Sequence, residues 1–437
     1  STLRLLREIG SCASLTVADL NDIVCDPDIL TASGSGYQKN LADYDIIFKS
    51  PGVKLEDQSA ETISKIHAQT SVFLSCFAPQ TIGITGTKGK STTATLLYHI
   101  LDSNKKLVCL AGNIGIPVFD VVEEIEKDTI IVLELSAQQL EYVRESPHTA
   151  VLLNIYEEHL DYFGTFERYA EAKRNIYRYQ GRGDILVCPA QEVSDDTCPC
   201  DGRLTTAPTV IMHGWGGCHP PDEGVVTADI GINGREIAYN GKSLHIAPGD
   251  TKLLGAHNLY NIAIVYALCQ RYEITDSDFL AALRTYQPLP HRLAHIGCVD
   301  GVDYYDDSIS TNCETTIEAL TAVENVGTLI LGGYERGLDY GPLIACLAEQ
   351  PPDNIILIPT TGTRIYAEIQ AQQAKQPDSF AKTALHLAKD LAEAVAIAKQ
   401  ATAKGKACLL SPAAASYDHY KNFEERGEAF KELVGSG

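Results

Sequence analysis

A glycine-rich turn between an apolar segment and a helix is the part of this sequence with the clearest chemistry. Residues 81–85 (TIGIT) predict a buried strand, and residues 91–103 predict a helix. Backbone N–H groups at the start of such a helix can bind phosphate oxygens. The lysine of such a turn contacts the β- and γ-phosphates of a nucleotide, and a following hydroxyl can bind Mg²⁺. We therefore predict a nucleoside triphosphate site at Gly86, Thr87, Lys88, Gly89, Lys90, Ser91 and Thr92. The match to GxxxxGK[ST] is incomplete, because Ile84 occupies the position of the first glycine.

Two further side chains follow or lie near other predicted strands. Glu134 lies near the end of the apolar run 130–135, and His159 follows the run 150–154. Open parallel sheets bind ligands beyond the carboxyl ends of their strands, and carboxylate oxygen is a good ligand for Mg²⁺. We predict Glu134 as a metal ligand and His159 as a candidate ligand of a second metal, although a single histidine is more often an ordinary surface or core residue. Lys173 has no distinguishing feature by itself.

The elements that must position these residues form three predicted α/β domains, at 1–79, 80–288 and 289–437. A chain of 437 residues is long enough for two to four domains. The first domain is expected to be a small Rossmann-like unit of four or five parallel strands, including 14–18 and 45–48. The sequence starts directly on a predicted helix, so we expect that the first strand and its Gly-rich turn are missing from it.

The second predicted domain is a parallel-sheet ATPase domain with strands at 81–85, 107–110, 130–135 and 150–154. A β-hairpin insertion is expected within 201–250, where Asn240-Gly241 is a typical two-residue turn. Helical periodicity returns at 257–272. The third domain is expected to be Rossmann-like as well, with a clear helix at 390–403 and strands at 301–305, 328–331, 354–358 and 407–410.

Charge and hydropathy restrict the partners. The formal net charge is −22 and no basic stripe is present, so nucleic acid is not an expected partner. No run approaches the roughly 18 apolar residues of a membrane span, and no secretion signal begins the sequence. We therefore expect a cytoplasmic protein that does not bind membranes.

The 13 cysteines are scattered and form no CxxC pair, which is typical of reduced, buried thiols. One loop-rich stretch contains four of them, enough ligands for a zinc ion. Their irregular spacing argues against zinc. These four are Cys188, Cys198, Cys200 and Cys218.

Taken in order, the motifs resemble those of the Mur ligase family, which builds the peptide stem of bacterial peptidoglycan. The resemblance runs nearly from end to end. Two of the motifs, ELSxxQLE and SPAAASYDxxxNFEERG, most resemble members that add D-glutamate to UDP-N-acetylmuramoyl-L-alanine. Besides the phosphate turn, the matching segments are AGNIGIP (111–117), LELSAQQLE (133–141), 153–173, GAHNLYN (255–261), PHR (290–292), DDSISTN (306–312), LGGYERGLDY (331–340) and LLSPAAASYDHYKNFEERG (409–427).

The resemblance implies three domains that bind the UDP end of the acceptor, ATP and the incoming amino acid, in a chain expected to be a monomer. It implies two Mg²⁺ ions, held by Ser91, Glu134, His159 and a carbamylated Lys173. It implies acceptor contacts from Asp19, Ser50, Gly52, Asn113, Ser136 and Gln139. It implies nucleotide contacts from Asn258, Asn261, Arg292 and Asp307. The implied amino-acid contacts are Thr311, Arg336, Ser416, Tyr417 and Phe423.

One position departs from the family pattern. The family usually has a lysine facing the glutamate carboxylate where this chain has Ile309. Arg336 lies where the family has another basic residue, and its planar guanidinium can bind a carboxylate through two hydrogen bonds. The selection of glutamate would then depend more heavily on Arg336, and the identity and hand of the amino acid stay open.

Three other functions remain as alternatives. A muramoyl ligase that adds L-glutamate, or an enzyme similar to folylpolyglutamate synthase, could use the same phosphate turn, although the NFEERG segment argues against the second. A non-catalytic nucleotide-binding subunit, such as the zinc-ribbon-bearing partner of an amidotransferase, is supported only by the cysteine cluster. The presence of Lys90, Glu134, His159 and Lys173 together favours an enzyme.

Overall fold

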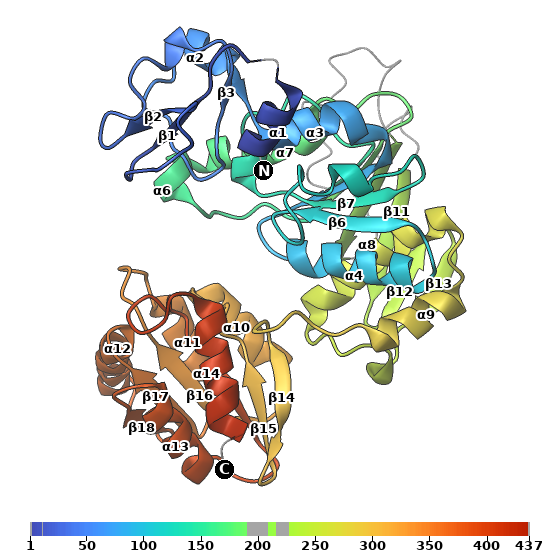
Figure 1. Cartoon of the computed structure of the whole chain (residues 1–437). Coiled ribbons are helices and arrows are strands. Elements are labelled where there is room, and N and C mark those ends of the chain that lie inside the picture. The colour runs from blue at the N-terminus through green and yellow to red at the C-terminus, as the bar shows by residue number, and fades with distance from the viewer. Residues whose placement is uncertain (1, 11, 190–208, 216–226, 436–437) are drawn as a thin grey trace. The chain divides into compact units, whose positions relative to one another are not determined.

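The computed structural model describes residues 2–10, 12–189, 209–215 and 227–435 (Figure 1). The chain divides into two compact units. The first contains residues 1–250 and 259–286, and the second contains residues 251–258 and 287–437. The predicted boundaries at 79/80 and 288/289 stay predictions. No helix in the described part of the chain is both long enough and apolar enough to cross a membrane.

The N-terminal part of the first unit has four short strands in two separate parallel pairs, β1 with β2 and β3 with β4. We expected one sheet of four or five strands here. The strands have only two to four residues and most of their residues are not buried, so they cannot form a continuous covered sheet. The elements are α1 (Thr2–Ile9), β1 (Thr16–Asp19), β2 (Leu30–Ser33), β3 (Ile47–Phe48), α2 (Ala60–Ser64), β4 (Ile66–His67) and α3 (Gln69–Phe77).

The rest of the first unit is built on a nine-stranded sheet in the order β13-β12-β11-β10-β9-β8-β5-β7-β6. The strands from β6 to β11 are all parallel, and β12 and β13 form the predicted antiparallel hairpin. Asn240 and Gly241 connect them with φ of 50° and 74°, as a type I′ turn requires. The strands are β5 (Thr81–Thr85), β6 (Val108–Gly112), β7 (Ile130–Glu134), β8 (Thr149–Leu152), β9 (Ile185–Pro189), β10 (Thr209–Trp215), β11 (Thr227–Asn233), β12 (Glu236–Tyr239) and β13 (Lys242–His245).

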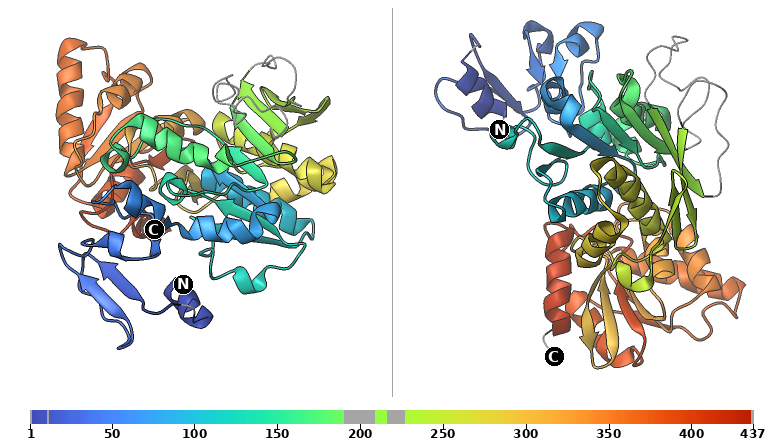
Figure 2. Two further views of the ribbon diagram at one scale, coloured as in Figure 1. Left: turned by 90° about the horizontal axis from the view of Figure 1, so that it is seen from above. Right: turned by 90° about the vertical axis from the view of Figure 1, so that its right-hand side faces the viewer.

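The central strands are buried on both faces because helices cover them (Figures 1 and 2). All five residues of β5 are buried, including Thr81 and Thr85, as expected for a strand that is covered on both faces. Helix α4 packs on β6 and β7, and α7 packs on β8 and β5. The helices are α4 (Lys90–Ser103), α5 (Ala137–Leu140), α6 (Leu160–Phe163), α7 (Phe166–Arg178), α8 (Ala256–Cys269) and α9 (Asp276–Thr285).

The second unit contains a six-stranded sheet in the order β14-β15-β19-β16-β17-β18. All neighbours are parallel except β14, which is antiparallel to β15. The strands are β14 (Ala294–Val299), β15 (Val302–Asp306), β16 (Val326–Gly332), β17 (Asn354–Ile358), β18 (Ala384–Leu387) and β19 (Ala407–Leu410).

Two hydrophobic cores lie on the two faces of this sheet. Leu329 and Leu331 belong to one core and Ile330 to the other, because successive side chains of a strand point to opposite faces. Helices α10 (Cys313–Ala322), α11 (Gly341–Glu349) and α12 (Thr361–Lys375) contribute to the first core. Helices α13 (Leu391–Ala401) and α14 (Phe423–Gly435) contribute to the second. This doubly wound arrangement confirms the predicted α/β fold class.

Candidate active site

The phosphate turn connects β5 to α4 and is held from two sides. The amides of Thr87 and Lys88 donate to the backbone and side-chain oxygens of Asn154 (2.9 and 2.8 Å). Gly89 has φ of 87°, and a Cβ there would lie 2.8 Å from Oδ1 of Asn261. Lys90 donates from Nζ to the carbonyls of Gly86 (2.9 Å) and Thr87 (3.0 Å), so its charge lies over the turn. The predicted turn, Lys90 and Asn261 therefore lie together at the start of α4.

Lys173 lies beside the same turn, although nothing in its sequence surroundings distinguishes it. Its side chain projects from α7, is 1% exposed, and donates from Nζ to the Gly86 carbonyl at 2.7 Å. Burial, and then the nearby charge of Lys90, lower the pKa of Lys173 well below its ordinary value. Its amine is therefore much more easily neutral, and nucleophilic, than that of a solvated lysine.

Glu134 ends β7 and is fully buried. Its Oε1 accepts a hydrogen bond from Nδ2 of Asn113 at 2.8 Å, whereas its Oε2 has no hydrogen-bond partner among the described residues. A buried carboxylate oxygen without a partner is costly. A cation bound there would satisfy it.

His159 comes after β8 at the start of α6, with a left-handed φ of 57°. Its ring lies 6.1 Å from that of Tyr169, whose hydroxyl is 3.0 Å from Oγ1 of Thr87. Burial lowers the pKa of His159 and favours the neutral imidazole that can bind a metal. Lys90 and Lys173 are both close enough for their charges to act on His159. The loop after β8 thus faces the phosphate turn.

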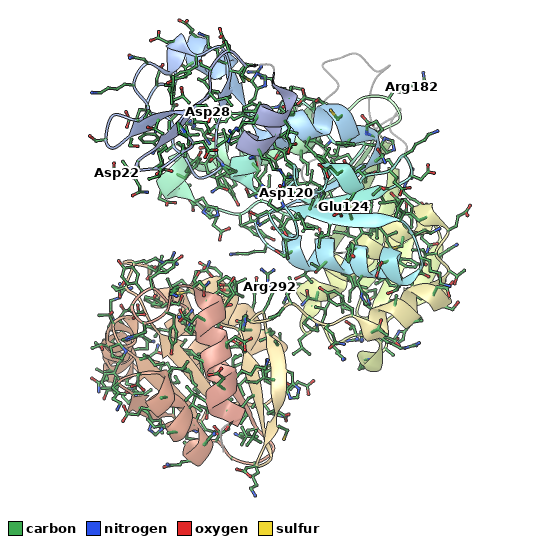
Figure 3. The ribbon with its side chains drawn as sticks, in the orientation of Figure 1. Asp22, Asp28, Asp120, Glu124, Arg182 and Arg292 are labelled. Atoms are coloured by element: carbon green, nitrogen blue, oxygen red, sulfur yellow. The ribbon has the colours of Figure 1, made fainter. Side chains whose placement is uncertain are left out.

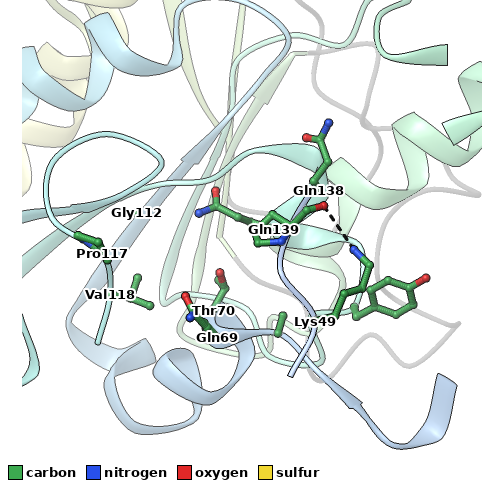
Figure 4. A pocket seen from close by; sticks show the side chains of 11 residues that line it. Lys49, Gln69, Thr70, Gly112, Pro117, Val118, Gln138 and Gln139 are labelled. Atoms are coloured by element: carbon green, nitrogen blue, oxygen red, sulfur yellow. Dashed lines mark hydrogen bonds between the residues drawn. The ribbon is translucent and has the colours of Figure 1, made fainter. Parts of the chain in front are cut away.

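A pocket within the first unit is lined by one of the predicted acceptor residues and by neighbours of several others (Figure 4). Gln139 lines it, and Ser136 and Gln139 form a capping box at the start of α5. Pro51, from the predicted Ser50–Gly52 turn, lines it as well, but Asp19 does not. Asp19 instead accepts hydrogen bonds from its neighbour Asn21. The full lining is Lys49, Pro51, Ala68, Gln69, Thr70, Gly112, Pro117, Val118, Gln138, Gln139 and Tyr142.

The other predicted nucleotide residues belong to the second unit. Asp307 is 4% exposed and accepts hydrogen bonds from Oγ of Ser411 (2.7 Å) and the amide of Leu293 (3.1 Å). Burial raises the pKa of Asp307 to about 7. Arg292 lies two residues before β14 (Figure 3). The side chain of Asn258 donates to the carbonyl of Leu254 at 2.7 Å. The residues predicted to bind the nucleotide are therefore divided between the two units.

Two neighbouring loops of the second unit carry Arg336, Ser416 and Tyr417 of the predicted amino-acid residues. Nη2 of Arg336 donates to the carbonyl of Thr311 at 2.8 Å. The amide of Tyr334 donates to the carbonyl of Ala415 at 2.9 Å, and the ring of Tyr334 lies 6.2 Å from that of Tyr417. The 334–340 and 411–417 loops therefore run side by side. Ser416 in the second loop is buried, and Phe423 begins α14 and packs near the ring of His291.

The sequence of this chain is similar to those of known proteins. Residues 84–269 match the Mur ligase middle domain. A UDP-N-acetylmuramoylalanine--D-glutamate ligase of Symbiobacterium thermophilum is 34% identical over 410 residues, covering 92% of this chain and 86% of that protein. The protein of the same name from Acetivibrio thermocellus is 32% identical, covering 94% and 86%.

This chain belongs to the Mur ligase family. Solved structures share its fold: MurF of Thermotoga maritima in complex with ADP has a TM-score of 0.56 at 17% identity and covers 97% of this chain and 89% of that one. MurC of Thermotoga maritima has a TM-score of 0.58 at 18% identity, covering 93% and 89%. Mur ligases are ATP-dependent, ADP-forming ligases that use Mg²⁺, and this chain is one of them.

The residues of this Mur ligase fit a magnesium ion. The unpartnered Oε2 of Glu134 is an oxygen ligand of the kind Mg²⁺ prefers, and it ends a parallel strand. In the described ranges there is no group of three or more His, Cys, Asp or Glu side chains that could hold a metal. Of the four cysteines weighed for zinc, Cys188 is fully buried in β9, and Cys198, Cys200 and Cys218 lie outside the described residues.

Sequence reasoning missed Lys49 in this Mur ligase. Its side chain lines the pocket of Figure 4 and is 3% exposed. The feature that could have pointed to Lys49 is its position directly before the predicted Ser50–Gly52 turn. The sequence around a single lysine does not show whether its side chain is buried.

Proposed function

We propose that this Mur ligase joins D-glutamate to UDP-N-acetylmuramoyl-L-alanine at the expense of ATP, in the synthesis of peptidoglycan precursors. Relatives at 30–34% identity are named UDP-N-acetylmuramoylalanine--D-glutamate ligase, and their name supports this choice of substrates. The observation that carries the proposal for this chain is the convergence of Lys90 and buried Lys173 on the carbonyl of Gly86, with Glu134 near enough to act on Lys173.

A carboxylate does not acylate an amine directly, because its oxygen is a poor leaving group. In the proposed reaction a carboxylate oxygen of the acceptor attacks the γ-phosphorus, and ADP leaves. The amine of D-glutamate then adds to the acyl phosphate, and the tetrahedral intermediate collapses with loss of inorganic phosphate and a proton. Lys90 and the amides at the start of α4 hold the phosphates during the first step.

The burial of Lys173 supports its proposed carbamylation. A neutral amine can add to carbon dioxide and release one proton, and the product is an anionic carbamate with two oxygen ligands. Ser91, Glu134, His159 and this carbamate would hold the two Mg²⁺ ions. When bound, magnesium neutralises charge on the phosphoryl group in transfer.

The other predicted contacts complete the proposal. Asp19, Ser50, Gly52, Asn113, Ser136 and Gln139 would bind the acceptor, and Asn258, Asn261, Arg292 and Asp307 the nucleotide. Thr311, Arg336, Ser416, Tyr417 and Phe423 would surround the amino acid. The exposed guanidinium of Arg336 lies beside Thr311 and supplies a cation that Ile309 cannot. The proposal includes that the protein acts as a monomer in the cytoplasm.

A phosphate-release assay tests the function. Purified protein with ATP, Mg²⁺ and UDP-N-acetylmuramoyl-L-alanine is expected to release phosphate with D-glutamate and much less with L-glutamate. Lys90→Ala is expected to lower turnover by at least about 100-fold, because it removes a charge that the transition state needs. Lys127→Ala, at an exposed lysine, is the matched control.

The outcomes separate the alternatives. Preference for L-glutamate would indicate the related L-glutamate-adding ligase. No phosphate release with any amino acid would contradict the proposed function.

A further inference from the structure

The side chains of Lys49, Glu141 and Tyr162 form a partly buried triangle. Nζ of Lys49 donates to the hydroxyl of Tyr162 at 2.8 Å, and the hydroxyl donates to Oε2 of Glu141 at 2.8 Å, with the carbonyl of Val53 at 3.0 Å. The third side of the triangle is the ion pair between Lys49 and Glu141, at 3.4 Å. The three groups therefore form one hydrogen-bonded network within the first unit.

Each corner of the triangle comes from a segment that the sequence singled out for a different reason. Lys49 directly precedes the Ser50–Gly52 turn and lines the pocket of Figure 4. Glu141 directly follows α5, the helix that carries Gln139 of the same pocket. Tyr162 lies in α6, the short helix that begins directly after His159. The triangle thus connects the pocket wall to the segment of the candidate metal ligand.

The two charged corners of the triangle are largely shielded from solvent. The side chains of Lys49 and Glu141 are 3% and 15% exposed. Nζ of Lys49 also lies over the rings of Tyr142 (5.2 Å) and Tyr162 (5.5 Å), so its charge is stabilised by their π-faces. Removing one partner of a buried, hydrogen-bonded charge leaves the other unpaired, and hydrogen bonds in such networks depend on one another. A change at Lys49 must therefore be felt at Tyr162.

Lys49 is also the one charged side chain among the pocket's lining residues. An ammonium group has three N–H donors. A negatively charged group in the pocket would add a partner to Lys49 and restrict the network to one arrangement.

We propose that Lys49 is a positioning residue that, through Tyr162, couples occupation of this pocket by an anionic acceptor to the order of α6 and His159. This rests on the proposed function, since it takes the pocket as part of the acceptor site. The coupling would assemble the His159 segment only when the acceptor is bound. ATP would then not be hydrolysed in the absence of the acceptor.

Hydrogen exchange measured by mass spectrometry on the full chain tests the coupling without nucleotide or metal. The amides of Tyr162, Phe163 and Gly164 report on α6, because they donate to the carbonyls of His159 and Leu160. In the wild type, UDP-N-acetylmuramoyl-L-alanine is expected to slow their exchange severalfold. Lys49→Met and Tyr162→Phe are expected to bring the ratio of exchange rates, free over bound, close to one. Lys65→Met, whose lysine lies in the same region but contacts Ala42 and Glu61, is the control and is expected to keep the wild-type ratio.

A purely structural triangle would raise exchange equally in the free and bound states and leave the ratio unchanged, which would overturn the inference. Titration calorimetry at saturating acceptor confirms that each variant is bound when its ratio is measured. Wild-type protein that binds the acceptor without slowing exchange in α6 would also overturn the inference and leave the proposed function intact. Wild-type protein that does not bind the acceptor would overturn both.

Discussion

Burial gives Lys173 a chemistry that its sequence surroundings do not show. Its amine is enclosed by α7, the ring of Tyr169 at 4.8 Å and the carbonyl of Gly86, and Lys90 adds a like charge nearby. Both effects disfavour the ammonium form. A solvated lysine at the same place would stay protonated at neutral pH and would not react with carbon dioxide.

Lys173→Ala is expected to lower turnover by at least about 100-fold, because it removes the proposed carbamate from the transition-state environment. Added formate or acetate is expected to restore part of the activity, since a small carboxylate can enter the space and supply the missing oxygens. The measurement is phosphate release with and without the added acid. Failure of rescue in a variant that still binds Mg²⁺ would count against the carbamate.

Arg336→Ala is expected to raise the KM for D-glutamate roughly ten- to hundredfold, the cost of losing a charged hydrogen bond. The KM for ATP is expected to stay near the wild-type value. Lys421→Ala, at an exposed lysine near the same loops, is the control. Steady-state kinetics with each substrate varied in turn gives the comparison, and equal increases in both KM values would exclude Arg336 from the amino-acid site.

At the scale of elements, the end of β6 is packed directly on the end of β7. Gly112 has φ of 106°, and a Cβ there would lie 2.2 Å from the backbone oxygen of Glu134. The amide of the next residue, Asn113, donates to this same oxygen at 2.9 Å. The close approach of the two strand ends therefore sets the position of the buried carboxylate.

Gly112→Ala is expected to push these strand ends apart and lower both stability and turnover. Gly183→Ala is the control, because Gly183 has a similar φ of 95° but open space around it. The control is expected to lose about 1–2 kcal/mol from backbone strain alone, and Gly112→Ala roughly 1–3 kcal/mol more from the clash. Denaturant unfolding measures both losses. Equal losses of stability in the two variants would show that the close contact between position 112 and Glu134 does not destabilise Gly112→Ala.

At the scale of the whole molecule, the chain has separate cores in its two compact units. Leu133 and Leu331 are both fully buried on parallel strands, one in each unit. The first unit carries exposed carboxylates such as Asp22, Asp28, Asp120 and Glu124 (Figure 3), in keeping with the net charge of −22. These carboxylates act on solubility rather than on the fold.

Leu133→Ala and Leu331→Ala are expected to lower the stability of their own units by about 2–5 kcal/mol each. Each unit buries its own apolar surface, so the other unit should be little affected. Hydrogen exchange of β5 and β8 in the first unit and of β17 and β19 in the second measures the two stabilities separately. Equal loss of protection in both units from either substitution would show that the chain unfolds as one cooperative body.

Local patterns in the sequence were enough to predict many of the strands and several of the helices. The buried strands 81–85, 354–358 and 407–410 match β5, β17 and β19 at both ends, because a strand covered on both faces is a short segment of mostly apolar residues. The Asn240-Gly241 hairpin followed from two residues that tolerate positive φ. The same local reading failed to separate the N-terminal strands into two pairs, since short, half-exposed strands carry little periodic signal.

The sequence by itself determined the phosphate turn, the order of the motifs and the α/β class, because each depends on residues close together in the chain. The tertiary structure decided which polar groups are buried and which of them form hydrogen bonds with one another. Lys173 meets Gly86 across 87 residues and Lys49 meets Tyr162 across 113. Burial shifts the pKa of Lys173 and binds Lys49 into its triangle, and burial depends on the packing of distant segments rather than on the identity of a single lysine.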